Sequence, residues 1–324
     1  MVEGKASTNF IRGMLYLLPA IVLLGIFTFY PLVNTFLISF KENYNFMKPD
    51  DTYSWGFENY KAIFVAAEGG ITDYAKYLIN TMIIVFVSVP ISILLSLLIA
   101  VALNSIKSLQ RVFQTIFFLP YVTNTIAIGM VFSVMFESNQ GLVNTIITFF
   151  GGDAINWLGG SDNGLLFEFA SGNATFNSQY FTSLIVLLIY IVWNSLPFKI
   201  LILLSALQSV DKQYYQAAQI DGTSKTRTFM KITVPLLSPQ IFYLLLTSLI
   251  GAFKEYTSVV AIFDQKAQSV GQRHNMATVV WYIYDELKSK GEAGNAAAGA
   301  VVLFIIIMIF TLINKVVSSK KVHY

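Results

Sequence analysis

The sequence predicts an all-α membrane protein with about six transmembrane helices, and three observations support this fold class. Of 324 residues, 55% are hydrophobic and only 12% are charged, whereas about a quarter of the residues in a soluble domain are charged. The mean hydropathy is +0.63. Six stretches reach the roughly 20 apolar residues that a helix needs to cross a bilayer core about 30 Å thick.

These six stretches are apolar on all sides rather than along one stripe, which is typical of helices embedded in lipid. They comprise residues 14–40, 78–104, 113–136, 182–207, 240–263 and 295–317. Together they predict one transmembrane domain over residues 14–317, between an N-terminal segment (1–13) and a tail (318–324). Internal prolines such as Pro90 and Pro197 are compatible with such helices, because neighbouring helices re-satisfy the freed carbonyl groups. The first stretch is too long for a signal-peptide core, so we expect it to remain as an anchor.

The distribution of basic residues predicts the orientation of the chain in the membrane. Segments 1–13, 105–112, 208–238 and 315–324 together contain 11 Lys and Arg residues and three acidic residues. The other non-membrane segments (41–77, 137–181 and 263–294) contain 8 basic and 14 acidic residues. We therefore expect both termini in the cytoplasm and three long acidic loops outside.

Motifs for catalysis or nucleotide binding are missing from the sequence. It contains no phosphate-binding Gly-x-x-x-x-Gly-Lys-Ser/Thr motif, no His-Glu-x-x-His and no Gly-x-Ser-x-Gly. It has no cysteine, and its two histidines, His274 and His323, are far apart in sequence, so no metal site is predicted. The net charge of +3 does not indicate a nucleic-acid partner. We expect a chain that is not an enzyme and holds no cofactor.

The longest predicted cytoplasmic loop, residues 208–238, is a candidate docking surface. Asp211 is a suitable N-cap for a helix that ends near Ile220, and Gly222 permits the backbone conformation that stops it. Thr223 or Ser224 can cap a second helix. That second helix would contain Phe229 and Ile232 and would end at Pro235 before the next span.

The spacing in this loop resembles the cytoplasmic "EAA" loop of permease subunits in binding-protein-dependent ABC importers. The matching residues are Gln216, Ala217, Ala218, Asp221, Gly222, Ile232 and Pro235. Asp221-Gly222 and the later Phe229 are typical of the carbohydrate branch (maltose/glycerol-phosphate-like). The sequence departs from the pattern at Gln216, where the family usually has Glu, and at Thr223, where it usually has Ala. The change at Gln216 argues against a salt bridge from this position to the ATPase.

Shorter phrases extend the resemblance over nearly the whole chain. They are Tyr30-Pro31-Leu32, Trp55-Gly56-Phe57-Glu58-Asn59-Tyr60, Asn80-Thr81, Phe118-Leu119-Pro120-Tyr121, Gly141-Leu142-Val143-Asn144 and Leu204-Ser205-Ala206-Leu207-Gln208. The resemblance implies a type I importer permease in a bacterial or archaeal inner membrane. It also implies a second permease subunit, two ATPase subunits that bind ATP and Mg, and an extracytoplasmic solute-binding protein.

The resemblance implies that the first helix of the loop couples to the ATPases. We expect contact from Tyr214, Tyr215, Gln216, Ala217 and Ala218, while Asp221 and Gly222 set the helix break. Candidates for the solute path within the spans are Tyr121, Asn124, Tyr190, Trp193, Asn194, Glu255 and Tyr256. The alternative for each aromatic residue is packing or a position at the lipid interface. Lys254 and Glu255 fit either the path or the interface, and packing or snorkelling is the favoured interpretation for Lys199.

Two alternatives remain for the function. One is an importer of glycerol phosphate or a peptide, although the acidic outer loops argue against an anion. A stand-alone secondary transporter or channel would show inverted repeats and ion sites at the middle of the membrane, and the sequence shows neither.

Overall fold

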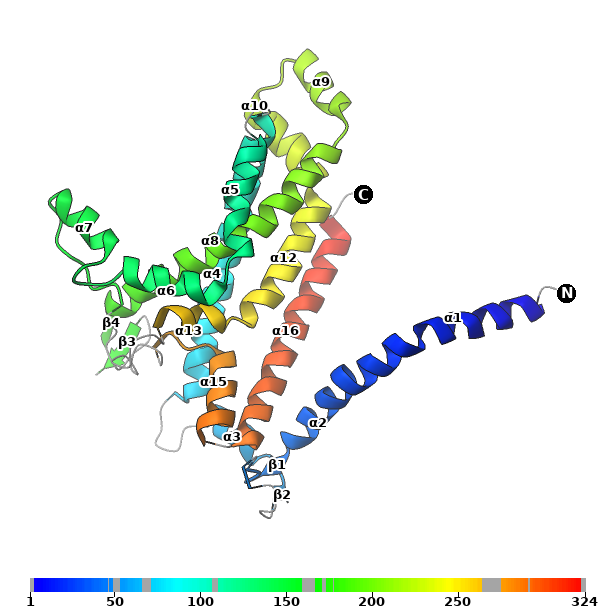
Figure 1. The fold of residues 1–324 in the computed structure, drawn as a ribbon, viewed down its shortest axis with the longest axis vertical. Coiled ribbons are helices and arrows are strands. Elements are labelled where there is room, and N and C mark those ends of the chain that lie inside the picture. The colour runs from blue at the N-terminus through cyan, green and yellow to red at the C-terminus, as the bar shows by residue number, and fades with distance from the viewer. Residues whose placement is uncertain are drawn as a thin grey trace. The chain divides into compact units, whose positions relative to one another are not determined.

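The computed structural model describes residues 3–45, 47–48, 53–65, 71–106, 110–158, 167–170, 173–176, 178–263, 275–290 and 292–321. Most of these residues are helical (Figure 1). Four continuous helical stretches are long and apolar enough to cross a membrane: Arg12–Ile38, Asp73–Ser105, Ser178–Ser209 and Ala293–Val317. They match the first, second, fourth and sixth predicted spans. Both histidines, and most of the glycine-rich stretch near residue 160, lie outside the described residues.

The third and fifth predicted spans are not single straight helices. The third divides into α5 (Gln110–Val122) and α6 (Thr125–Met135), which are bent by 97°. The cause is Asn124, whose backbone is extended and whose side chain accepts hydrogen bonds from the N–H groups of Ile126 and Ala127. An N-cap of this kind starts a new helix. The predicted span 113–136 is therefore divided between two helices, and six spans result only if each bent pair counts as one.

The fifth predicted span, 240–263, is likewise interrupted. Helix α12 (Ser238–Phe253) ends at Lys254, and α13 (Thr257–Phe263) begins three residues later. Before α12 lie α10 (Lys225–Thr228), a π-helical turn η2 (Phe229–Thr233) and α11 (Val234–Leu236), bent by 67° from α12. Pro235 thus lies within the last of these helical turns rather than ending the second helix of the loop.

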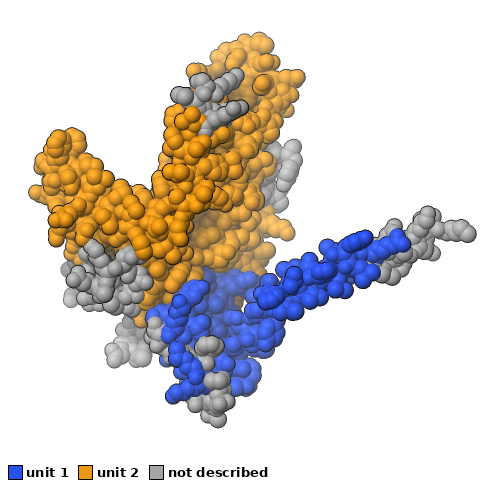
Figure 2. Space-filling view, in the orientation of Figure 1, with its two compact units in different colours: residues 1–72, 282–304 blue, residues 73–281, 305–324 orange. Residues whose placement is uncertain are grey.

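The chain divides into two compact units (Figure 2), and the division falls within two helices, α15 (Val279–Asp285) and α16 (Ala293–Lys321). Unit 1 comprises Met1–Thr72 and Tyr282–Phe304. Its helical elements are α1 (Glu3–Leu24), η1 (Gly25–Phe29), α2 (Tyr30–Ile38), α3 (Glu58–Phe64) and η3 (Glu286–Lys290), and its antiparallel strands are β1 (Lys41–Glu42) and β2 (Ser54–Trp55). The buried Asn59 side chain donates 3.0 Å hydrogen bonds to the carbonyls of Ser39 and Lys41, which joins α3 to β1.

Unit 2 comprises Asp73–Trp281 and Ile305–Tyr324. It is built around α4 (Asp73–Ser105) and α8 (Ser178–Ser209), which pack along each other. A further helix, α7 (Leu142–Phe149), a hairpin of β3 (Phe167–Ala170) and β4 (Asn173–Phe176), and α9 (Lys212–Ile220) complete this unit. One apolar cluster joins α4, α8 and α12 through buried residues that include Leu97, Leu203 and Leu244.

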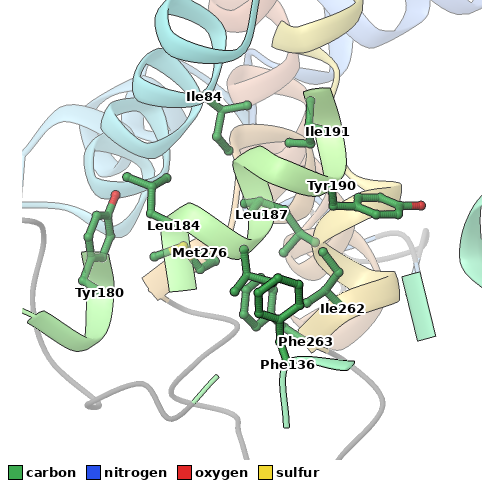
Figure 3. Packing of buried hydrophobic residues seen from close by; sticks show 12 residues of the cluster. Ile84, Phe136, Tyr180, Leu184, Leu187, Tyr190, Ile191, Ile262, Phe263 and Met276 are labelled. Carbon is green, nitrogen blue, oxygen red and sulfur yellow. The ribbon is translucent and has the colours of Figure 1, made fainter. Parts of the chain in front are cut away.

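A second apolar cluster in unit 2 holds the bent helices in place (Figure 3). Ile84 of α4 and Leu187 of α8 belong to it together with Ile262 and Phe263 of α13. Gly129 of α6 lies so close to α13 that a β-carbon there would collide with the side chain of Ala261. Between membrane helices such clusters are stabilised by van der Waals packing, and close packing keeps the helix positions unique.

Two buried amides fix the ends of these helices. Asn80 of α4 donates to the carbonyls of Asn275 (2.6 Å) and Ala277 (3.0 Å), and its oxygen accepts from the hydroxyl of Tyr180 at 2.7 Å. Asn144 of α7 donates to the carbonyls of Ser138 and Ile155, and accepts from Ile155 N–H and from the indole N–H of Trp157. The phrases Asn80-Thr81 and Gly141-Leu142-Val143-Asn144 therefore carry structural hydrogen bonds.

Candidate functional site

The 208–238 loop folds at its N-terminal end as the sequence predicts. The Asp211 carboxylate accepts a 2.9 Å hydrogen bond from Gln213 N–H, and this cap starts α9, which ends at Ile220. Gly222 follows with φ of +63°, in the left-handed region where a β-carbon is unfavourable. Ser224 caps the next turn by accepting from Arg227 N–H. In Figure 1, α9 lies beyond the end of α8.

Helix α9 has an outward and an inward face. Tyr214, Gln216 and Ala217 are exposed, and Ile220 is 87% exposed. Ala218 is only 5% exposed, and the Tyr215 hydroxyl lies 3.4 Å from Thr233 Oγ1. The structure therefore places two of the five predicted contact residues, Tyr215 and Ala218, against this chain.

A cavity of about 390 Å³ lies between the helices of unit 2. Its lining comes from α4, α5, α8, α12 and α13, and from the link between the last two. The residues are Ser88, Val89, Ser92, Tyr121, Ile191, Asn194, Ser195, Phe198, Lys199, Thr247, Ser248, Gly251, Ala252, Glu255 and Ser258. A volume of this size is in the range of small-molecule sites.

The lining includes six serine and threonine residues and one aromatic pair. Serine and threonine side chains both donate and accept hydrogen bonds, so they suit a solute with many hydroxyl groups. The rings of Tyr121 and Phe198 are stacked, with centroids 6.2 Å apart and planes 15° from parallel. Such a pair offers a flat apolar surface beside the polar groups.

The cavity contains one cation and one anion among its lining residues. Lys199 is 6% exposed, and its ammonium donates to Ser92 Oγ on α4 and to Ser195 Oγ, 3.1 Å away, on its own helix. The Glu255 carboxylate accepts a 3.0 Å hydrogen bond from Ser258 N–H at the start of α13. No carboxylate in the described part of the chain lies within 4 Å of Lys199.

Three of the seven candidates for the solute path, Tyr121, Asn194 and Glu255, line this cavity. Asn124 instead caps α6. Tyr190 and Trp193 contact the ring of Phe132, and the Tyr190 hydroxyl donates to the carbonyl of Thr125. Tyr256 is half-buried and is not part of the lining. Lys254, on which the sequence left two interpretations open, is exposed at the end of α12.

The sequence interpretation missed the serines and underrated Lys199. A signal was present, because Ser88 and Ser92 on α4, and Ser195 and Lys199 on α8, each follow the four-residue spacing that places side chains on one helix face. What the spacing does not reveal is that these two faces lie opposite each other.

Comparisons with known proteins agree with this fold. Residues 92–323 match the model of the family described as "Binding-protein-dependent transport system inner membrane component". The arabinooligosaccharides transport system permease protein AraP of Bacillus subtilis is 29% identical over 93% of this chain and 86% of its own length. The trehalose/maltose transport system permease protein MalF of Thermococcus litoralis is 27% identical over 93% of this chain and 91% of its own length.

The fold also resembles solved structures. A chain in the crystal structure of a bacterial alginate ABC transporter, in complex with alginate pentasaccharide-bound periplasmic protein, superposes with a TM-score of 0.78. The match covers 98% of this chain and 97% of that one at 17% identity, so it bears on the fold alone. Because the family model covers well over half of the sequence, this chain belongs to the family of binding-protein-dependent transport system inner membrane components.

Proposed function

We propose that this chain is a membrane-spanning subunit of an ATP-driven ABC importer that moves a sugar or oligosaccharide into the cell. The hydroxyl-lined cavity of unit 2 carries the proposal, because it lies inside a bundle whose sequence belongs to a family of transport components. The names of relatives that transport arabinooligosaccharides and trehalose/maltose support the choice of solute. The membrane would be the inner membrane of a bacterium or archaeon.

The energy for uptake would come from other subunits. Two ATPase subunits would bind ATP and Mg, and each permease would present one loop such as 208–238 to them. On this chain, the exposed residues Tyr214, Gln216, Ala217 and Ile220 would form the contact. Tyr215 and Ala218 would transmit force because they pack against the rest of the chain. Asp221 and Gly222 would fix the angle between the two helices of the loop.

Alternating access would then move the helices around the cavity. ATP binding to the ATPases would favour one conformation of the importer over the other. The change in the populations of the two conformations is limited by the difference in their affinities for ATP. The breaks at Asn124 and at Lys254–Tyr256 allow α6 and α13 to move differently from α5 and α12. A second, distinct permease subunit would complete the path, and an extracytoplasmic binding protein would deliver the solute.

The test is uptake by the reconstituted assembly. Proteoliposomes that contain this chain, its partner permease, the ATPases and the binding protein should accumulate a labelled sugar or oligosaccharide only when ATP is enclosed. This chain purified alone should hydrolyse no ATP. Uptake of glycerol phosphate or a peptide with no uptake of any saccharide would contradict the proposed solute, and ATP-independent uptake by this chain alone would contradict the class of transporter.

A further inference from the structure

Lys199 differs from the other cavity residues because it is a buried charge with neutral partners. Burying an ammonium group is costly unless it is paired or fully hydrogen-bonded. An ammonium has three N–H donors, and those of Lys199 reach two acceptors, Ser92 Oγ and Ser195 Oγ, among the residues that the structure describes. One donor is therefore left for a group in the cavity.

The rest of the lining limits what that group can be. Glu255 lines the same cavity, so one positive and one negative residue face a common space with no net charge. A solute with a single negative charge would be attracted by Lys199 and repelled by Glu255, whereas a neutral hydroxylated solute can satisfy both. Hydroxyl oxygens accept from an ammonium, and hydroxyl protons are donated to a carboxylate.

We propose that Lys199 is a specificity-determining residue, whose free N–H donates to a hydroxyl or ring oxygen of a neutral saccharide held in this cavity. This inference rests on the proposed function and specifies the solute as uncharged at the position that Lys199 contacts. Ser92 and Ser195 would fix the direction of the ammonium, and the stacked pair of Tyr121 and Phe198 would face the apolar side of a sugar ring.

The position of Lys199 also explains how this contact can be sensitive to conformation. The hydrogen bond from Lys199 to Ser92 links α8 to α4. Pro197 lies two residues before Lys199 on α8, and Pro90 lies two residues before Ser92 on α4. Prolines remove one hydrogen bond from a helix and allow it to bend at that level. A bend there would change where the ammonium points, so solute recognition would depend on the state of the importer.

The test compares Lys199→Met with wild type in the full reconstituted importer, with Lys315→Met as a matched control at an exposed position of α16. Three solutes are supplied: the saccharide that wild type imports, its deoxy analogues, and the corresponding sugar acid. Loss of a hydrogen bond from a charged group is expected to weaken solute binding by about tenfold or more. We expect Lys199→Met to lower the uptake of the parent saccharide by that factor and to lose the preference for it over one deoxy analogue. Lys315→Met should import the parent saccharide as wild type does and should keep the preference for it over the deoxy analogues.

The outcomes separate this inference from the proposed function. Equal loss for the parent and every deoxy analogue would make Lys199 structural and overturn the inference, as would stronger uptake of the sugar acid by wild type. Lys199→Arg, which retains donors, should recover part of the preference that Lys199→Met loses. Uptake and preference like those of wild type in Lys199→Met would also overturn the inference. If wild type imports no saccharide, the proposed function itself fails.

Discussion

The 208–238 loop and the cavity of unit 2 both carry polar side chains in a mostly apolar chain, but they are built in opposite ways. The loop obtains its shape from neighbours in sequence: Asp211 starts α9 and Gly222 ends it. The cavity obtains its shape from five helices that are spread over residues 73–263. The loop turns Tyr214 and Gln216 outward, whereas the cavity turns hydroxyl groups and Lys199 inward. The comparison indicates that the loop suits a protein partner and the cavity a small polar solute.

The largest effect should come from changing the conformation of the loop. Gly222→Leu forces a side chain onto a backbone with φ of +63°, at a cost of about 1–2 kcal/mol. Nothing lies within 4 Å of the added β-carbon, so the expected result is a changed helix break and loss of nearly all uptake, with normal insertion. The measurement is solute uptake by vesicles with matched amounts of protein.

Gly151→Leu is the matched control for that change. Gly151 also has a positive φ, +84°, and open space at its β-carbon, but it follows α7 and is far from the loop in sequence. Its backbone strain should be similar and its effect on coupling small. Equal uptake by Gly222→Leu and wild type would contradict a coupling role for the loop. Equal loss of uptake in Gly222→Leu and Gly151→Leu would indicate that backbone strain at any position, rather than the loop itself, causes the loss.

A smaller effect is expected from Asn80→Ala, which removes three hydrogen bonds that fix α4 in unit 2. The loss should destabilise the protein by about 1–3 kcal/mol, seen as a lower unfolding midpoint in detergent. Asn314→Ala is the control, because Asn314 only donates to the carbonyl of Phe310 within its own helix. If the two variants unfold at the same temperature, the Asn80 amide is not a structural anchor.

The smallest effect concerns the hairpin of unit 1. Glu58 N–H and the Ser54 hydroxyl donate to the Glu42 carboxylate, and these bonds lower its pKa below the ordinary value of 4.5. A carboxylate whose pKa is lower in the folded than in the unfolded protein stabilises the folded state at pH values above the unfolded-state pKa. This stabilisation is lost as the pH falls through the folded-state pKa. The hairpin should therefore loosen only below pH 4.5, visible as a change in Trp55 fluorescence. Glu42→Gln should shift or abolish this transition, and an identical transition in both proteins would contradict the assignment.

The sequence predicts features that depend on neighbouring residues, as in the loop, better than features that depend on tertiary packing, as in the cavity. Four spans and α9 follow from local patterns: apolar length, the Asp211 cap and the glycine stop. The break at Asn124 was missed because an asparagine within an apolar stretch can be either a solute contact or a cap, and only the backbone N–H groups of Ile126 and Ala127 decide. Tyr190 and Trp193 were candidates for the solute path because of their residue type, but tertiary packing places them on Phe132.

The serines of the cavity were missed for a related physical reason. A serine in a membrane helix commonly donates to a carbonyl of its own helix, as Ser92 does to Val89. The sequence does not distinguish this local bond from a position in a cavity. Only the pairing of α4 with α8 gives Ser92 a second role, as the acceptor for Lys199.

The central claim is that the outward face of α9 contacts an ATPase subunit, and site-specific cross-linking tests it most directly. The chain has no cysteine, so Ile220→Cys can carry a thiol-reactive photo-cross-linker in the assembled importer, with Asn139→Cys as an exposed control outside the loop. The account predicts a covalent product between this chain and the ATPase from position 220 and none from position 139. Cross-linking from Asn139→Cys alone, or from neither position in an importer that is active, would contradict it.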